Sequence, residues 1–175
     1  MVSQMIHNLE GDLLLSTADL IAHGVAPDDD WKSGLALALR QRFPSLHKDF
    51  RHHCHQQNPK PGSAWLWQGV DQGGRHWRIA CLLTQEPPAH QGGHPGKAHT
   101  EYVNQSLHAL KQMLEKEKVK SVALPRLACG VGGLDWKHVE PLIQAQLGGL
   151  KIPVLVYAKY VANVAAKEPQ ASAAK

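Results

Sequence analysis

A glycine-rich stretch in the last third of the chain is the strongest sign of chemistry. It reads Leu124-Pro-Arg-Leu-Ala-Cys-Gly-Val-Gly-Gly-Leu-Asp-Trp136, with an apolar strand pattern before it and a helical pattern after it. Glycines let backbone amides approach an anion closely, and a following helix adds its partial positive charge. The stretch lacks the Gly-Lys-Ser/Thr of a Walker loop and the spacing of a dinucleotide fingerprint. It predicts a diphosphate site; the alternative is a tight turn with Asp135 as an ordinary helix cap.

A second loop of similar type lies earlier in the chain. It reads Pro27-Asp-Asp-Asp-Trp-Lys-Ser-Gly34 and also joins a strand pattern to a helix pattern. Two such loops on neighbouring strands can clamp one diphosphate from both sides, so the pair favours an anion site more than either loop alone. Carboxylates repel an anion, so we expect Asp28 and Asp29 to face solvent. Asp30 or Lys32 is then expected to approach the ligand.

The elements that must position these loops follow from hydrophobic periodicity and turn residues. In chain order, we predict a strand and bend over 4–15, a strand over 20–24, a helix from 35 to 43, a short helix over 46–55, hairpin strands over 64–67 and 77–83, a long loop over 84–99, a helix over 101–118 capped by Thr100, a strand over 121–124, a helix over 139–147 preceded by a turn, and a strand over 152–157. This order predicts an α/β protein, a three-layer α/β/α sandwich with a mixed central sheet. Ligands of such sheets bind beyond the carboxyl ends of the strands.

Size and composition set the remaining limits. The 175 residues suit one domain, over 1–163, and we expect the tail 164–175 to be disordered because it lacks large apolar residues. No run of 18 apolar residues and no signal-peptide pattern occurs, and three widely spaced cysteines suit a reducing compartment, so we expect a cytoplasmic protein. The four consecutive side chains of His52-His-Cys-His55 point to different faces of a helix, so we expect no metal site there.

Several segments together resemble the macrodomain superfamily. These are Gly11-Asp12-Leu13, Leu20-Ile-Ala-His23, Ser33-Gly-Leu-Ala36, Leu83-Thr84 and above all the stretch from Leu124 to Trp136. They are most similar to the branch that contains the terminal ADP-ribose protein glycohydrolases and the antitoxins that remove ADP-ribose from DNA. The resemblance spans residues 5–157 and implies a macrodomain-like fold that binds ADP-ribose.

The resemblance also implies roles for individual residues. Asp12 would accept a hydrogen bond from the adenine amino group, Leu13 would add a backbone contact, and Tyr157 would lie near the adenosine; their alternatives are a turn cap for Asp12 and core packing for Tyr157. The two loops would hold the diphosphate. The full set of expected ligand-binding residues is Asp12, Leu13, Lys32, Ser33, Gly34, Leu35, Thr84, Gln85, Cys129, Gly130, Val131, Gly132, Gly133, Leu134 and Tyr157.

Catalysis is where the chain departs from this branch. The resemblance implies a lysine after the strand that ends in Leu83-Thr84, where it attacks the ribose, but Gln85 stands here. Gly132 stands where the branch has an aspartate. An amide is not a useful nucleophile, so a catalyst must come from elsewhere. The candidates lie in or just after the long loop 84–99, and they are Lys97, His99 and Glu101, with His94 also within reach of the distal ribose; the alternative is that these are surface residues.

Two functions of different classes remain open from the sequence. The chain is an ADP-ribose-binding macrodomain that hydrolyses an ADP-ribosyl linkage on protein or nucleic acid, or it is a non-catalytic reader of ADP-ribose or a related nucleotide metabolite. A metal-dependent phosphoesterase that uses the histidines is a third alternative. The expected partners are ADP-ribose or an ADP-ribosylated protein or nucleic acid, with no membrane, no cofactor and no metal, and the expected state is a monomer.

Overall fold

The computed structural model describes residues 5–169. Its elements in chain order are β1 (Ile6–Gly11), the short 3-10 helix η1 (Leu13–Leu15), β2 (Leu20–Val25), α1 (Gly34–Arg42), α2 (Pro44–Gln57), β3 (Ala64–Val70), β4 (His76–Leu83), α3 (Thr100–Glu117), β5 (Val122–Pro125), α4 (Trp136–Leu147) and β6 (Val154–Tyr160). The predicted order of strands and helices is confirmed.

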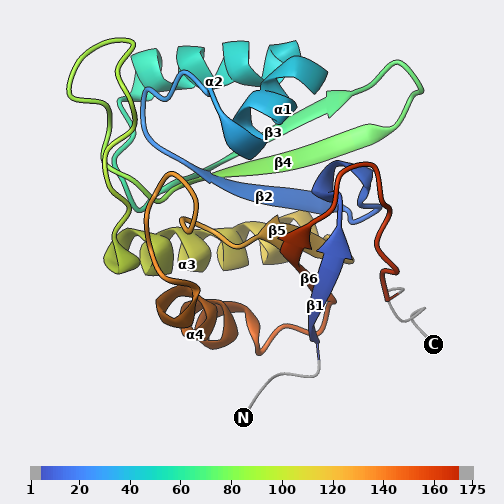
Figure 1. Ribbon diagram of the computed structural model, residues 1–175. Coiled ribbons are helices and arrows are strands. Elements are labelled where there is room, and N and C mark those ends of the chain that lie inside the picture. Colours follow the sequence, from blue (N-terminus) through green and yellow to red (C-terminus); the bar gives the residue numbers. More distant parts are fainter. Residues whose placement is uncertain (1–4, 170–175) are drawn as a thin grey trace.

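The six strands form one mixed sheet in the order β1-β6-β5-β2-β4-β3. Only β3 and β4 pair antiparallel, as the predicted hairpin; the other neighbours are parallel. The carboxyl ends of β2, β4 and β5 therefore lie at the same edge of the sheet. The loops that follow these three strands gather beyond that edge, on the left in Figure 1.

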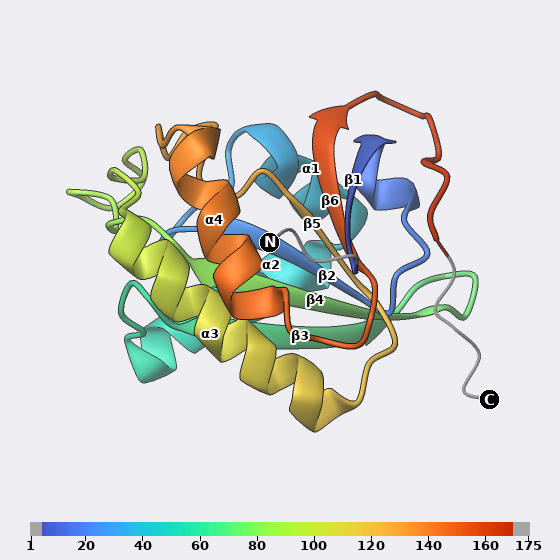
Figure 2. The ribbon, with the colours of Figure 1, turned by 90° about the horizontal axis from the view of Figure 1, so that it is seen from below.

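Helices cover both faces of the sheet. Figure 1 shows α1 and α2 on one face and α3 and α4 on the other, and Figure 2 looks onto the second face. Each face has its own apolar core, with Leu39 and Phe50 buried on the first side and Leu107 and Ile143 buried on the second. The predicted three-layer α/β/α sandwich is confirmed. Within residues 5–169, every helix is too short or too polar to cross a lipid bilayer.

Three helix boundaries differ from the sequence prediction. Thr100 is the first residue of α3 and not its cap, because the chain enters the helix from His99 in extended conformation. Pro44 does follow the end of α1, but it also begins α2, a position where its missing N–H is not needed. The helix α4 begins at Trp136 and holds Pro141 in its interior, because the Asp135 side chain accepts a hydrogen bond from the Lys137 amide and so starts the helix early.

The described part of the C-terminal segment, expected from the sequence to be disordered, makes contacts with the rest of the domain. Residues 164–169 lie against the ends of β1 and β6, and the Asp12 amide donates to the Val164 carbonyl at 2.7 Å. The carboxylate of Glu168 accepts hydrogen bonds from Ser16 and Tyr157 at 2.6 Å each. Polar contacts hold this segment, and Ala166 also packs against the apolar core. Residues 170–175 of the expected tail lie outside the described residues.

Candidate functional site

A cavity of about 350 Å³ opens at the edge where β2, β4 and β5 end. Its walls come from the end of β2, the loop into α1, the loop after β4 and the glycine-rich loop after β5. The lining residues are His23, Gly24, 29–36, Gln85, 93–95, 125–128 and 130–132. The two loops that the sequence predicted to act together thus face one another across one cavity.

The loop between β2 and α1 is fixed from inside by Asp29. The Asp29 carboxylate accepts hydrogen bonds from the Ala26 amide at 3.1 Å and the Trp31 amide at 2.9 Å. Asp29 is 7% exposed, so the expectation that it faces solvent is wrong. Burial raises the pKa of this carboxyl group, and the two amides oppose that shift only in part. The carboxylate therefore organises the loop.

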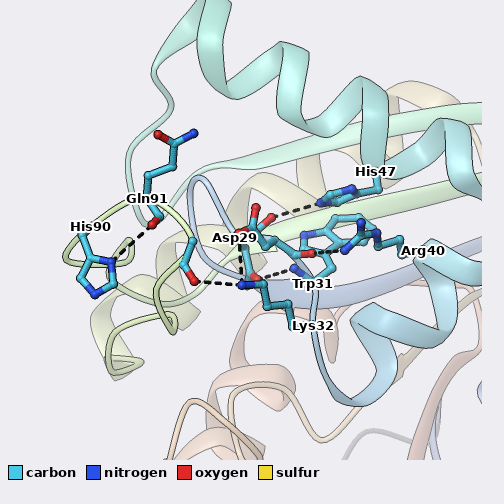
Figure 3. Close-up of polar contacts among 9 residues, drawn as sticks. Asp29, Trp31, Lys32, Arg40, His47, His90 and Gln91 are labelled. Carbon is cyan, nitrogen blue, oxygen red and sulfur yellow. Dashed lines mark hydrogen bonds and ion pairs between the residues drawn. The ribbon is translucent and has the colours of Figure 1, made fainter.

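Trp31 anchors the same loop in a conformation that most side chains avoid. Its φ of 55° lies in the left-handed region, yet the indole is buried. Its ring centroid lies 5.0 Å from that of His23 and 5.1 Å from those of His47 and Phe50. This packing offsets a backbone strain of the kind that clusters at ligand sites. Figure 3 shows how the helices hold the loop, with Arg40 donating to the Asp30 carbonyl at 2.9 Å.

The loop delivers the start of α1 to the cavity. Gly34 is the first residue of the helix and has a φ of +60°, and the Ser33 hydroxyl makes no capping hydrogen bond. The first amides of a helix lack intrahelical partners and attract anions. Because Ser33, Gly34 and Leu35 all line the cavity, the N-terminus of α1 supplies one half of a candidate anion cradle.

The glycine-rich loop supplies the other half. It folds on itself, with the Leu134 amide donating to the Ala128 carbonyl at 2.9 Å. The Gly132 carbonyl accepts from the Ala98 amide at 3.1 Å, which joins this loop to the long loop after β4. A side chain at Gly132 has no room, because its Cβ atom would lie 2.7 Å from the Ala128 carbonyl oxygen. Gly130, Val131 and Gly132 line the cavity.

The long loop over 84–99 closes a third side. Gln85 is 4% exposed, and its side-chain amide donates to the Gly96 carbonyl at 3.0 Å. The Lys32 ammonium donates to the Gly92 carbonyl at 2.9 Å, which ties the long loop to the loop before α1 (Figure 3). Gln85, His94 and Lys32 therefore line one cavity although they are far apart in sequence.

The three candidate catalytic residues lie elsewhere. Lys97, His99 and Glu101 are exposed, and none of them lines the cavity. The His99 ring packs edge-on against Tyr102, and its Nε2 atom lies 3.8 Å from the Glu86 carboxylate. Of these four histidine, lysine and glutamate candidates, His94 alone lines the cavity.

The residues expected at the adenosine end also lie outside the cavity lining. Asp12 starts η1, accepting from the Leu14 amide at 3.0 Å and from the Asn163 amide at 3.1 Å. The Tyr157 hydroxyl donates to Glu168, and burial raises its pKa. Five further members of the predicted set do not line the cavity either; they are Leu13, Thr84, Cys129, Gly133 and Leu134.

His23 and Arg126 line the cavity but were missed as ligand residues. His23 lies within β2, where a polar residue in an apolar run is itself a signal. Its Nε2 atom lies 3.2 Å from the Cys81 sulfur, and burial lowers its pKa to about 3, so the ring is neutral at pH 7. Arg126 lies over the Trp136 ring, with 5.3 Å between the guanidinium carbon and the ring centroid.

The histidine cluster on α2 does not form a metal centre in the described part of the chain. Cys54 points into the core, whereas the His53 ring stacks on Trp65 with 5.2 Å between the ring centroids. His52 and His55 are exposed. Among residues 5–169, no group of three or more His, Cys, Asp or Glu side chains is placed to share an ion.

Comparison with known proteins identifies relatives for most of the chain. The Macro domain family matches residues 22–143. A DNA ADP-ribosyl transferase-DNA ADP-ribosyl glycohydrolase fusion protein of Thermosipho africanus is 26% identical over 170 residues, which is 89% of this chain but only 42% of that protein. The human protein named ADP-ribose glycohydrolase OARD1 is 25% identical over 85% of this chain and 88% of its own length.

Solved structures agree with the fold. The macrodomain of Thermus aquaticus DarG has a TM-score of 0.74 and 26% identity, and it covers 88% of this chain and 98% of its own. The structure of Thermosipho africanus DarTG in complex with ADP-ribose has a TM-score of 0.76 and 23% identity, over 91% of this chain and 42% of its own.

Proposed function

The chain belongs to the Macro domain family, and from this premise we propose that it binds a terminal ADP-ribosyl group in the cavity at the ends of β2, β4 and β5. The observation that carries the proposal is that the N-terminus of α1 and the glycine-rich loop face each other across that cavity. Backbone amides on two sides hold a diphosphate without a metal ion, because both loops add partial positive charge. The names of the relatives, which include DNA and ADP-ribose glycohydrolases, support ADP-ribose as the ligand.

The ligand is oriented by its diphosphate. Lys32, Ser33 and Gly34 contact one side of it, and Gly130 to Gly132 contact the other. The distal ribose then extends toward the third wall, where Gln85 and His94 lie. One N–H of the Gln85 side-chain amide is donated to Gly96, and its carbonyl oxygen is an acceptor suited to a hydrogen bond from a ribose hydroxyl.

Recognition without cleavage is the function that these side chains support best. The position where the branch carries its attacking lysine holds a neutral amide, and the lysine proposed as a substitute, Lys97, lies outside the cavity lining. Hydrolysis remains the second candidate because Asp30 and His94 both line the cavity, and a carboxylate and an imidazole are suited to acid–base catalysis.

One experiment separates these candidates. The native chain is incubated with mono-ADP-ribosylated protein and with ADP-ribosylated DNA, and released ADP-ribose is measured next to calorimetric binding of free ADP-ribose. Binding with no release supports the reader. Release at a rate that falls in His94→Ala and Asp30→Asn supports the hydrolase. If ADP-ribose does not bind, the proposal that ADP-ribose is the ligand of this cavity is refuted.

Gln85→Lys sharpens the comparison. If the cavity is complete except for its nucleophile, this variant gains release from a substrate that the native chain only binds. Gln85→Met is the matched control, because it keeps the length of the side chain but adds no amine. Equal release by both variants would contradict the role given to position 85.

A further inference from the structure

An oxyanion site that the diphosphate cavity does not include lies between η1 and β6. Its donors are the Ser16 hydroxyl, the Thr17 amide, the Thr17 hydroxyl and the Tyr157 hydroxyl, which all point at one carboxylate, that of Glu168. The four donor–acceptor distances run from 2.6 to 2.8 Å. Ser16 is fully buried and Tyr157 is 5% exposed, so their hydroxyls are fixed in place, whereas Thr17 is exposed.

The electrostatic surroundings suit a negative charge. The Arg75 guanidinium donates to the Ser16 carbonyl at 3.1 Å, and the charge of Glu168 acts on it. Burial raises the pKa of the Glu168 carboxyl group, but the hydrogen bonds from Ser16, Tyr157 and Thr17 together lower it below its usual value. Glu168 is therefore held as a carboxylate at neutral pH.

The segment that leads to Glu168 runs across residues that are expected to hold the nucleoside. Between Tyr160 and Glu168 the segment passes over Asp12, whose amide donates to the Val164 carbonyl and whose carboxylate accepts from the Asn163 amide. Figures 1 and 2 both show this C-terminal segment leaving β6 and running beside η1. The chain's own backbone thus lies against Asp12, where an adenine is expected, and it uses the Asp12 amide and one acceptor site of the carboxylate.

We propose that Ser16, Thr17 and Tyr157 form an oxyanion site that Glu168 fills in cis, and that residues 161–169 must leave Asp12 before a nucleoside can bind there. This inference rests on the proposed function for the identity of the nucleoside, but not for the oxyanion site. The site accepts a carboxylate from the chain itself or a phosphate from solution, because both present oxygens to the same four donors.

The first test is calorimetric titration of ADP-ribose into the full chain and into Glu168→Ala. A ligand that needs a minor open form binds more weakly by the fraction open, so a segment seated in about nine molecules of ten predicts a gain of about tenfold in affinity. A chain that stops after Pro169 is the matched control, because it keeps Glu168, and its affinity is expected to equal that of the native chain. Unchanged or weaker binding by Glu168→Ala would refute the proposal that residues 161–169 compete with the nucleoside for Asp12.

Hydrogen exchange at individual amides distinguishes displacement of the segment from a general change in stability. Saturating ADP-ribose is expected to speed exchange of the Thr17 and Asn163 amides, which donate to Glu168 and Asp12. Slower exchange of these amides would mean that the segment completes the ligand site, and it would overturn the proposal.

Inorganic phosphate tests the oxyanion site without any nucleotide. It is expected to raise the Tm of Glu168→Ala more than that of the native chain, and the excess is expected to vanish when Thr17→Val is added. An equal rise in all three proteins overturns the site. If neither the native chain nor Glu168→Ala binds ADP-ribose, the proposed function fails, while this phosphate comparison still decides the oxyanion site.

Discussion

Gly132 is the position where one added carbon atom is expected to damage the cavity most. A Cβ atom there would lie 2.7 Å from the Ala128 carbonyl oxygen and 2.8 Å from the Ala98 Cβ atom. Both neighbours are held by hydrogen bonds, since Leu134 donates to Ala128 and the Ala98 amide donates to Gly132 itself. Gly132→Ala must therefore push the glycine-rich loop and the long loop apart.

The size of this effect follows from overpacking. Adding a methyl group to a closely packed site costs about 1–3 kcal/mol, and loss of the hydrogen bond between Ala98 and Gly132 adds about 1 kcal/mol. We expect Gly132→Ala to lower the free energy of unfolding by about 2–4 kcal/mol, a range that follows from those two terms. The same shift moves the diphosphate amides, so affinity for ADP-ribose should fall by at least about tenfold, which is 1.4 kcal/mol.

Gly130→Ala is the matched control, two residues away in the same loop. A Cβ atom at Gly130 meets no atom within 4 Å, and the residue is exposed. Its free energy of unfolding should change by less than about 0.5 kcal/mol. Urea unfolding followed by circular dichroism measures stability, and calorimetry measures affinity. If the two alanine variants unfold at the same urea concentration, the packing argument for the loop is refuted.

Three further predictions concern other parts of the site. For His23, the folded-state pKa of about 3 lies below the unfolded value of 6.5. Its contribution to the free energy of unfolding is therefore complete above pH 6.5 and falls toward pH 3, by up to about 1.4 kcal/mol per pH unit. His23→Gln should make this fall less steep in unfolding experiments, and an unchanged slope would contradict the prediction. Asp29→Ala leaves the Ala26 and Trp31 amides without their acceptor. It should lower the free energy of unfolding in urea by about 2–4 kcal/mol and weaken ADP-ribose binding. A decrease of less than about 1 kcal/mol would show that the loop does not depend on this carboxylate. Lys97→Ala should leave calorimetric affinity unchanged because the side chain is exposed outside the cavity, and a slower release of ADP-ribose by this variant would restore Lys97 as a catalyst.

Steric crowding explains why this chain has a glycine at position 132. The backbone approaches so closely there that an aspartate side chain would meet the Ala128 carbonyl, so the glycine is required by the conformation of the loop as it stands. Gln85 is different, because its side chain occupies a defined place and donates to Gly96. A lysine at position 85 therefore requires a change of side chain but no change of backbone. For this reason Gln85→Lys is the informative variant.

Much of the fold was predictable because its signals are local. The 4, 3, 4 spacing of Val103, Leu107, Leu110 and Leu114 specifies the buried face of α3, and all four are buried. The turn residues between β3 and β4 specify the hairpin. Helix starts were less predictable, because Asp135 and Pro44 act through hydrogen bonds and backbone geometry that hydrophobic periodicity does not report.

The sequence by itself determined the order of elements and the two loops that meet at the cavity, since each is encoded in neighbouring residues. The tertiary structure alone decided which polar side chains turn inward. It buried Asp29 under its own loop, brought His23 to the cavity wall and left Lys97 outside. It also paired Asp12 with Asn163 across 151 positions of chain, because such contacts depend on how strands order within the sheet and leave no local pattern.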